Sequence, residues 1–492
     1  MDILLAAAPL VIPALGAAVY AIAGWRPATA HVATASALLS LLVAVLLAAR
    51  VVADGPIAVA ALLRVDAVGA FMLIVITAVA VLVAVATPAH LAAELDAGRI
   101  GTRTVTWHAV LVQAFLAAMA LAVTAADLGL LWVAVEATTI ITAFLVGQRR
   151  TRAAVEAAWK YVVICSAGIA LALLGIVVLG HASAHSRTGA GLDWAALALA
   201  APQLDPAVTR IAVVLLIVGF GTKAGLAPLH AWLPDAHSQA PAPVSALMSG
   251  VLLAVAFSAV LRVKVISDGA LGPGFARGLL IAAAIASLLV AASLLIAQRD
   301  YKRMLAYSSI EHMGLLALGA AAGGPLATAA VLLHVLGHGL AKCVLFLGAG
   351  RLLQTTGTSR IDGVRGLAAR QPVLAGAVGA GVLALLGLPP FSLFASELGI
   401  VSAGFGTGIG WAAAAALVLV VVIGAALVTH TGRMLLGAAP EGPGAAPAPL
   451  VLPRSTAAAL IVGLAGCAVL GITAGPLSVL LEHAAATLGG IR

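Results

Sequence analysis

Apolar residues fill most of the chain in long runs, and short breaks rich in charged residues, proline or glycine separate them. A hydrocarbon core about 30 Å thick needs roughly 20 apolar residues per crossing helix. The runs have this length, so we predict an all-α polytopic membrane protein with about fourteen transmembrane helices. The predicted spans are 3–24, 30–53, 65–88, 107–125, 127–146, 157–180, 207–227, 241–263, 274–297, 303–322, 325–350, 373–400, 406–429 and 457–477.

Two of these spans, the seventh and the twelfth, contain proline where a simple membrane anchor would not need it. The seventh carries Pro228 shortly after Gly225, and the twelfth carries Pro389 and Pro390 after Gly387. Proline removes a backbone donor and clashes with the preceding turn, so both helices should break at membrane depth. Exposed backbone is tolerated there only beside protein or a water-filled cavity. We therefore expect helices 7 and 12 to be broken and to face a polar interior.

The two breaks lie five spans apart, which indicates an internal repeat. The spacing from Glu136 to Lys223 nearly equals that from Glu311 to Glu397. Units of five helices must alternate in orientation, so the sequence predicts two inverted repeats. The predicted division is 1–106 for helices 1–3, 107–263 for the first repeat (helices 4–8), 264–430 for the second (helices 9–13) and 431–492 for a C-terminal loop and helix 14.

The composition excludes a soluble protein and changes little else. Hydrophobic residues make up 63% of the 492 positions and charged residues 9%, and the mean hydropathy is +1.17, values far from those of globular domains. The cysteines at 165, 343 and 467 occur singly, without a Cys-x-x-Cys pair, so we expect no cofactor or redox centre on this chain. The net charge of +8 comes from basic residues in short loops, which favours membrane topology over nucleic-acid binding.

The loops differ in basic residues from one side of the membrane to the other. One side carries fifteen: Arg26, Arg99, Arg103, Arg149, Arg150, Arg152, Arg299, Lys302, Arg303, Arg351, Arg360, Arg365, Arg370, Arg433 and Arg454. The other carries eight: Arg50, Arg64, Arg187, Arg210, Arg262, Lys264, Arg277 and Arg492. Because cytoplasmic loops are enriched in Lys and Arg, we predict a plasma-membrane protein with the first side cytoplasmic and both termini extracytoplasmic.

Three glutamates and three lysines fall inside the predicted spans. They are Glu136, Lys160, Lys223, Glu311, Lys342 and Glu397. A charge at the bilayer centre costs about 2.5–3.5 kcal/mol on insertion scales, so these side chains should face a hydrated, protein-lined interior. They could be structural ion pairs or a proton relay, and their recurrence along the chain favours the relay.

Glu136 and Lys223 have the chemistry of a proton switch. A poorly hydrated pocket lowers the pKa of a lysine, and a nearby carboxylate raises it again. If the distance between the two side chains changes, the lysine alternates between holding and releasing a proton. The hypothesis is a pump element made of these two residues.

The eleventh span adds titratable groups at i, i+4 and i+8 on one helix face: His334, His338 and Lys342. They are about 6 Å apart along the axis, close enough to pass a proton through one or two waters. A His-x-x-x-His pair could also bind a metal, but no third Cys or His has suitable local spacing, so we predict none. The tenth span contributes Glu311 and His312.

A titratable segment follows the first break. His230, Asp235 and His237 lie among aromatic residues there. The segment could support the relay or serve only as an interfacial anchor.

These motifs, in this order, resemble the antiporter-like subunits shared by complex I, multisubunit cation/proton antiporters and membrane-bound [NiFe] hydrogenases. The matching stretches are 221–237, 242–250, 300–309, 334–342 and 387–390, and the resemblance spans roughly residues 107–430. It implies fourteen helices with inverted repeats. Residues 309–314 and 237–244 look most like the F component of hydrogenase-4 and formate hydrogenlyase-like complexes. A departure is Ala254, where several relatives carry a lysine.

The resemblance also implies roles for single residues. Glu136 and Lys223 would be the paired carboxylate and pump lysine, and Lys160 an auxiliary group. His334, His338 and Lys342 would form the central relay, and Glu397 the exit. Without the lysine at 254, water or His312 would have to complete the path between Lys223 and the eleventh span.

The function that follows is a proton-translocating, non-catalytic subunit of a redox-driven complex, in particular a group 4 [NiFe] hydrogenase or a related respiratory complex. The expected partners are other membrane subunits, the lipid bilayer and a peripheral cytoplasmic module, hydrogenase-like or dehydrogenase-like, that carries iron-sulfur clusters. Two alternatives stay open. One is a subunit of a sodium/proton antiporter, and the other is a non-transporting scaffold that docks a redox module.

Overall fold

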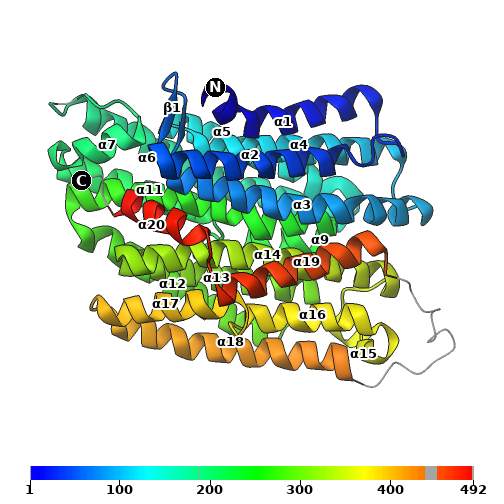
Figure 1. Cartoon of the computed structure of the whole chain (residues 1–492). Helices are drawn as coiled ribbons and strands as arrows, with labels where there is room; N and C mark the ends of the chain where they lie inside the picture. Colours follow the sequence, from blue (N-terminus) through cyan, green and yellow to red (C-terminus); the bar gives the residue numbers. More distant parts are fainter. Residues whose placement is uncertain (1, 188, 438–451, 490–492) are drawn as a thin grey trace.

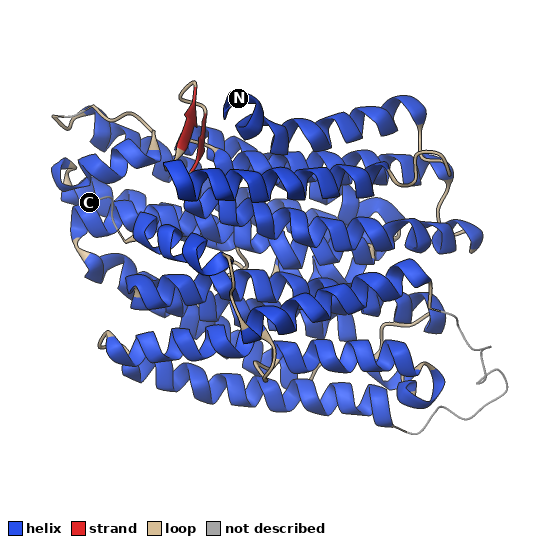
Figure 2. Ribbon diagram, viewed as in Figure 1, coloured by secondary structure: helices blue, strands red, loops and turns tan. Residues whose placement is uncertain are grey.

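A computed structural model describes residues 2–187, 189–437 and 452–489 as a bundle of roughly parallel helices (Figures 1 and 2). Residues 438–451 of the predicted C-terminal loop, and Arg492, lie outside the described residues. Among the described helices, twelve are long and apolar enough to cross a membrane. The prediction of an all-α polytopic membrane protein is confirmed, while the number fourteen, the repeats and the four-part division stay predictions.

The first half of the bundle is made of these helices: α1 (Asp2–Ala23), α2 (Val32–Asp54), α3 (Ala67–Asp96), α4 (Thr102–Thr124), α5 (Leu128–Val146), α6 (Arg152–Ala184), α7 (Trp194–Ala200), α8 (Pro206–Lys223), α9 (Trp232–Gln239), α10 (Ala242–Leu247) and α11 (Leu253–Leu271). The second half is made of α12 (Pro273–Ile296), α13 (Tyr301–Ala322), α14 (Gly324–Thr356), α15 (Leu367–Arg370), α16 (Pro372–Leu385), α17 (Ser392–Gly406), α18 (Gly410–Leu436), α19 (Arg454–Ile472) and α20 (Leu477–Leu488). A short antiparallel hairpin, β1 (Ile57–Val59) and β2 (Leu63–Val65), connects α2 to α3.

The helix breaks lie where proline predicted them. Helix α8 ends at Lys223, and the chain turns through Gly225, whose φ of +79° suits glycine, before α9 begins. The freed backbone groups find partners, because Trp232 Nε1 donates to Thr222 O at 3.0 Å and Ala227 N donates to Ser287 Oγ at 2.9 Å. The second break separates α16 from α17 and turns through Gly387, with φ +59°. The first break buries its unwound residues 224–227, whereas Leu388, Pro389 and Pro390 at the second break are exposed, so the expectation of a polar interior around both breaks does not hold for the second.

Helix α14 is the long buried helix at the centre of the bundle. In its most apolar 18-residue stretch, 94% of the residues are buried. It meets the α10–α11 segment at a pair of glycines: a Cβ on Gly339 would lie 2.8 Å from Gly250 O, and one on Gly250 would lie 3.0 Å from Gly339 O. Gly250 sits in a π-helical turn, Met248–Leu252, a feature that often occurs at functional sites. At this point the backbones of the two segments are in direct contact, which a side chain at either glycine would prevent.

The two described ends of the chain lie at the same end of the bundle, on the left of Figure 1. Near that end, the buried Arg262 joins α11 to the hairpin region. Its guanidinium donates to the carbonyls of Val123 and Ala125, lies 3.6 Å from Asp66 Oδ1, and stacks over Trp194 at 4.5 Å. Arg262 was predicted to lie in a basic loop, but the structure buries it beside Asp66 as a structural ion pair.

Candidate functional site

The side chain of Lys223 ends in a buried pocket at the first helix break. Its Nζ donates to Thr139 Oγ1 at 2.8 Å and to the hydroxyl of Tyr161, and lies 4.6 Å from the Tyr161 ring centroid. Tyr161 is held in place by Thr142, 2.5 Å away, and by an edge contact with Trp232. Hydroxyl oxygens and an aromatic face stabilise an ammonium without cancelling its charge.

Glu136 lies one turn before Thr139 on α5, so the structure brings it to the region of the Lys223 pocket. Its Oε1 accepts a hydrogen bond from Ser166 at 3.3 Å, and its Oε2 is buried without a partner among the described residues. Within the described ranges it makes no ion pair with Lys223. In this structure Lys223 Nζ contacts the Thr139 and Tyr161 hydroxyls instead of the Glu136 carboxylate.

Lys160 differs from its predicted position. Its side chain is 48% exposed on the outside of α6 and pairs with Glu156 at 2.7 Å and Asp235 at 3.2 Å. The prediction that it faces the protein interior is wrong, because position 160 lies on the outer face of α6, one residue before the inward-facing Tyr161. Asp235 also pairs with Arg303 at 2.5 Å, so this cluster links α6, α9 and α13.

A lysine that the sequence analysis placed in a loop is buried instead. Lys302 is 1% exposed, and its Nζ donates to Ser238 O at 2.9 Å and Ala240 O at 2.8 Å. The sequence feature that could have indicated this burial is the position of Lys302 within the motif Asp300–Ser309. His237, also fully buried, stacks on Phe346 at 4.9 Å, and neither ring nitrogen has a hydrogen-bond partner in the described part of the chain. His230 is only partly buried, and its Nδ1 is likewise unpartnered.

The central lysine, Lys342 on α14, resembles Lys223 in its surroundings. Its Nζ donates to Leu305 O at 2.8 Å and Ser308 Oγ at 2.5 Å, both on α13. One residue further on, Ser309 shares a 2.7 Å hydrogen bond with Ser249 in the π-helical turn. Hydroxyl groups therefore connect α13 to the π-helical turn that leads into α11.

A histidine cluster continues the polar path. His312 Nδ1 lies 3.1 Å from His334 Nε2, and His334 Nδ1 lies 3.0 Å from Ser396 Oγ. The His338 ring is 5.1 Å from the His312 ring. Buried polar atoms normally have hydrogen-bond partners. Among the residues that the structure describes, the Nε2 atoms of His312 and His338 and the Oε2 of Glu311 have none, so we expect bridging water there.

Glu397 completes a possible metal-binding group. One ligand atom each from His312, His334 and Glu397 lies within 4.8 Å of the others. Two imidazoles and a carboxylate would suit a divalent ion such as zinc. The sequence analysis missed this group because its members are on three helices, α13, α14 and α17, and only the fold brings them together.

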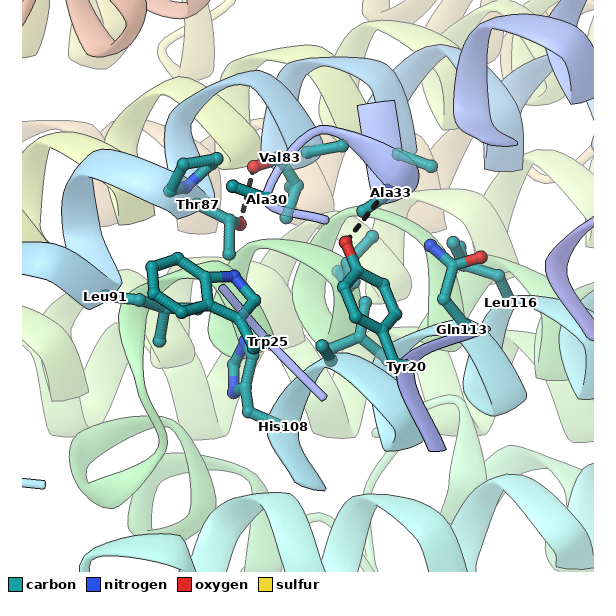
Figure 3. A pocket seen from close by; sticks show the side chains of 16 residues that line it. Tyr20, Trp25, Ala30, Ala33, Val83, Thr87, Leu91, His108, Gln113 and Leu116 are labelled. Atoms are coloured by element: carbon teal, nitrogen blue, oxygen red, sulfur yellow. Dashed lines mark hydrogen bonds between the residues drawn. The ribbon is translucent and has the colours of Figure 1, made fainter. Parts of the chain in front are cut away.

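A conservative change at Tyr161 tests the Lys223 pocket. Tyr161→Phe keeps the ring but removes the hydroxyl that Lys223 contacts, and losing a partner of a buried charged group costs about 1–3 kcal/mol. We expect proton flux through reconstituted protein to fall roughly tenfold. Tyr20→Phe is the matched control, because the Tyr20 hydroxyl binds Ala33 N at 3.0 Å in a separate cavity of about 20 Å³ between α1, α2, α3 and α4 (Figure 3). Equal flux in both variants would contradict a role for the Tyr161 hydroxyl.

A broken-helix bundle around buried lysines, histidines and carboxylates defines an antiporter-like membrane protein. Residues 125–424 match the family described as NADH:quinone oxidoreductase/Mrp antiporter, transmembrane, and the chain belongs to this family. It is 40% identical over 319 residues to a hydrogenase-4 component F homolog of Methylacidiphilum infernorum, with 64% of this chain and 67% of that protein aligned. It is 38% identical to NADH-quinone oxidoreductase subunit N of Desulforudis audaxviator, over 56% of this chain and 55% of that subunit.

A solved structure is similar over nearly the whole chain. A chain of the membrane-bound sulfane sulfur reductase, described as an archaeal respiratory membrane complex, superposes with a TM-score of 0.86 at 26% identity. The alignment covers 99% of this chain and 98% of that one. The resemblance inferred from the sequence motifs is confirmed at the level of the family, and relatives of this chain are subunits of multisubunit membrane complexes.

Proposed function

We propose that the chain is the proton-translocating subunit of a redox-driven membrane complex, of the group 4 [NiFe] hydrogenase or a related respiratory type. The observation that carries the proposal is that Lys223 and Lys342 inside the spans are fully buried and held by neutral oxygens. Lys302, 1% exposed and bound to two carbonyls, is of the same kind at the start of α13. A structural lysine at this depth would be expected to pair with a carboxylate. One that contacts only hydroxyl, carbonyl and aromatic groups can lose and regain its proton without leaving a buried anion behind.

The geometry supports a sequence of proton transfers. Glu136, with one free oxygen beside the Thr139 turn, biases Lys223 toward its protonated form when it approaches. Lys342 and the serine hydroxyls of α13 receive the charge in the middle of the bundle. His338, His312 and His334 then relay it toward Glu397, which lies after the second helix break and is partly exposed. Lys160, exposed and paired at the cluster of Asp235 and Arg303, is a structural ion pair beside this path.

The proposed partners are further membrane subunits and a peripheral cytoplasmic redox module with iron-sulfur clusters. The lysine and histidine path supplies proton movement, and this chain's predicted lack of a redox centre leaves the electron transfer to the module. The test is the purified complex in vesicles, with proton and sodium movement recorded together during redox turnover. We expect proton movement that persists without sodium. A strict sodium requirement would favour an antiporter subunit, and redox turnover without any ion movement would favour a scaffold.

We also propose that the protein lies in the plasma membrane with the basic loops in the cytoplasm. Ala369 on α15 and Ala207 at the start of α8 are both exposed and, on this topology, lie on opposite sides. The native cysteines are all buried, so the labelling background is low. An impermeant thiol reagent added to intact cells should label Ala207→Cys and spare Ala369→Cys. The reverse pattern would overturn the orientation.

A further inference from the structure

An open groove runs along the outside of the bundle between α4, α5 and α6, away from the lysine and histidine path. Its volume is about 950 Å³. It begins where α4 and α6 start and α5 ends, and it extends toward the membrane interior along Trp107 and Leu111 on one wall and Trp159 and Val162 on the other. Its length along α4, from Arg103 to Leu111, is about 12 Å at 1.5 Å per residue.

The charged side chains that line the groove are all positive. Arg103 and Arg150 stand at its outer end, both exposed, and no acidic side chain lines it. In the parts of the chain that the structure describes, neither arginine makes an ion pair. The neighbouring Arg149, by contrast, lies 3.7 Å from Glu94. Two uncompensated guanidiniums at the end of a membrane groove suit an anionic headgroup, since basic pockets between transmembrane helices bind such lipids.

From its outer end inward, the groove changes from charged to apolar, in the same order as a phospholipid from headgroup to acyl chain. Below the arginines, the indoles of Trp107 and Trp159 are 54% and 66% exposed, at the level where tryptophan meets lipid headgroups. Further in, the groove is lined by the apolar Leu111 and Val162, and the exposed Ile140 and Phe144 on α5 form an apolar floor between the outer end and the level of the indoles. An acyl chain would cover these surfaces, while a soluble ligand would leave them in contact with lipid or water. We propose that this groove binds one anionic phospholipid.

The groove adjoins the proposed proton path through α6. Trp159 is followed by Lys160, which pairs with Asp235, and by Tyr161, which contacts Lys223. His108 lines both the groove and the small cavity of Figure 3, and its Nδ1 lies 2.8 Å from Gln148 Oε1. A lipid packed against α6 therefore supports the helix that holds Tyr161 in place.

Native mass spectrometry of the purified full chain, or of the complex that contains it, tests the proposal. Phosphatidylglycerol and phosphatidylcholine of equal chain length would be added separately after delipidation. We expect one phosphatidylglycerol to be retained and phosphatidylcholine to be lost. Arg103→Gln combined with Arg150→Gln should weaken phosphatidylglycerol retention tenfold or more, an effect on the order of that expected for removing two basic residues near a lipid surface.

Two further variants keep the test decisive. Arg299→Gln with Arg370→Gln removes two basic residues from the same end of the bundle outside the groove and should leave retention unchanged. Ala143→Phe fills the floor of the groove without altering charge and should also release the lipid. Equal retention of both lipids, equal loss in the Arg299 and Arg370 control, or a protein subunit occupying the groove in the intact complex would each overturn the proposal.

Discussion

Lys223→Met should abolish coupled proton movement while leaving the protein assembled. Methionine has nearly the volume of the lysine stem, and such swaps in a packed interior usually cost less than about 1.5 kcal/mol. The Thr139 and Tyr161 hydroxyls that contact Nζ retain other partners, because Thr139 can donate to Val135 O at 3.4 Å and Tyr161 remains beside Thr142. The variant therefore removes a proton carrier without removing the fold.

The expected loss of flux is on the order of a hundredfold or more, the scale of a positioned acid–base group. The measurement is proton uptake by vesicles per turnover of the redox module, with assembly checked on native gels. Lys264→Met is the matched control, because Lys264 pairs with Asp268 one turn away near the end of α11, beside a separate outer cavity. Unchanged flux in Lys223→Met, with normal assembly, would refute the assignment of Lys223 as the pump lysine.

Glu136→Gln and Glu397→Gln should each block proton movement, at opposite ends of the path. If Glu136 and Lys223 act as one proton switch, as proposed, Glu136→Gln combined with Lys223→Met should be no worse than either change alone. Residues in one network typically deviate from additivity by about 0.5–3 kcal/mol. Glu397, in a different helix and beyond the histidines, belongs to the exit.

Single and double variants separate a relay from a scaffold. Proton flux per redox turnover is the measurement, and Glu482→Gln on the exposed face of α20 is the matched control for removing a carboxylate. A relay loses flux in both the Glu136 and the Glu397 variants while the control keeps it. Full flux in both variants, with normal turnover, would leave only the scaffold interpretation.

Much of the fold follows from patterns that are local in the sequence. The spans follow from run length, and the breaks at Lys223 and before Ser392 follow from proline and glycine, because these residues act on their own turn of helix. The long buried α14 was recognisable as the helix with His334, His338 and Lys342 on one face. The β1–β2 hairpin was missed because three-residue strands in a loop leave no periodic signal.

The sequence predicted which residues belong to the candidate site better than it predicted how those residues contact one another. Spacing placed Glu136 and Lys223 in spans, but it could not tell that Lys223 would contact hydroxyls instead of the Glu136 carboxylate, since partners from other helices decide that. Lys160 was predicted to face the interior and is exposed, whereas Lys302 was predicted in a loop and is buried. A shift of one residue around a helix decides which side chain faces inward, and the sequence does not fix that shift. The His312, His334 and Glu397 group needed three helices to be assembled first.

The neutral surroundings of Lys223 and Lys342 affect how many protons the proposed proton path can hold at once. Neither ammonium rests on a counter-ion, so the field of each extends through a medium where charges interact more strongly than in water and mobile salt does not enter. We therefore expect a proton on one lysine to disfavour a proton on the other. The path would then hold one excess proton at a time, and a second proton would enter only after the first had left.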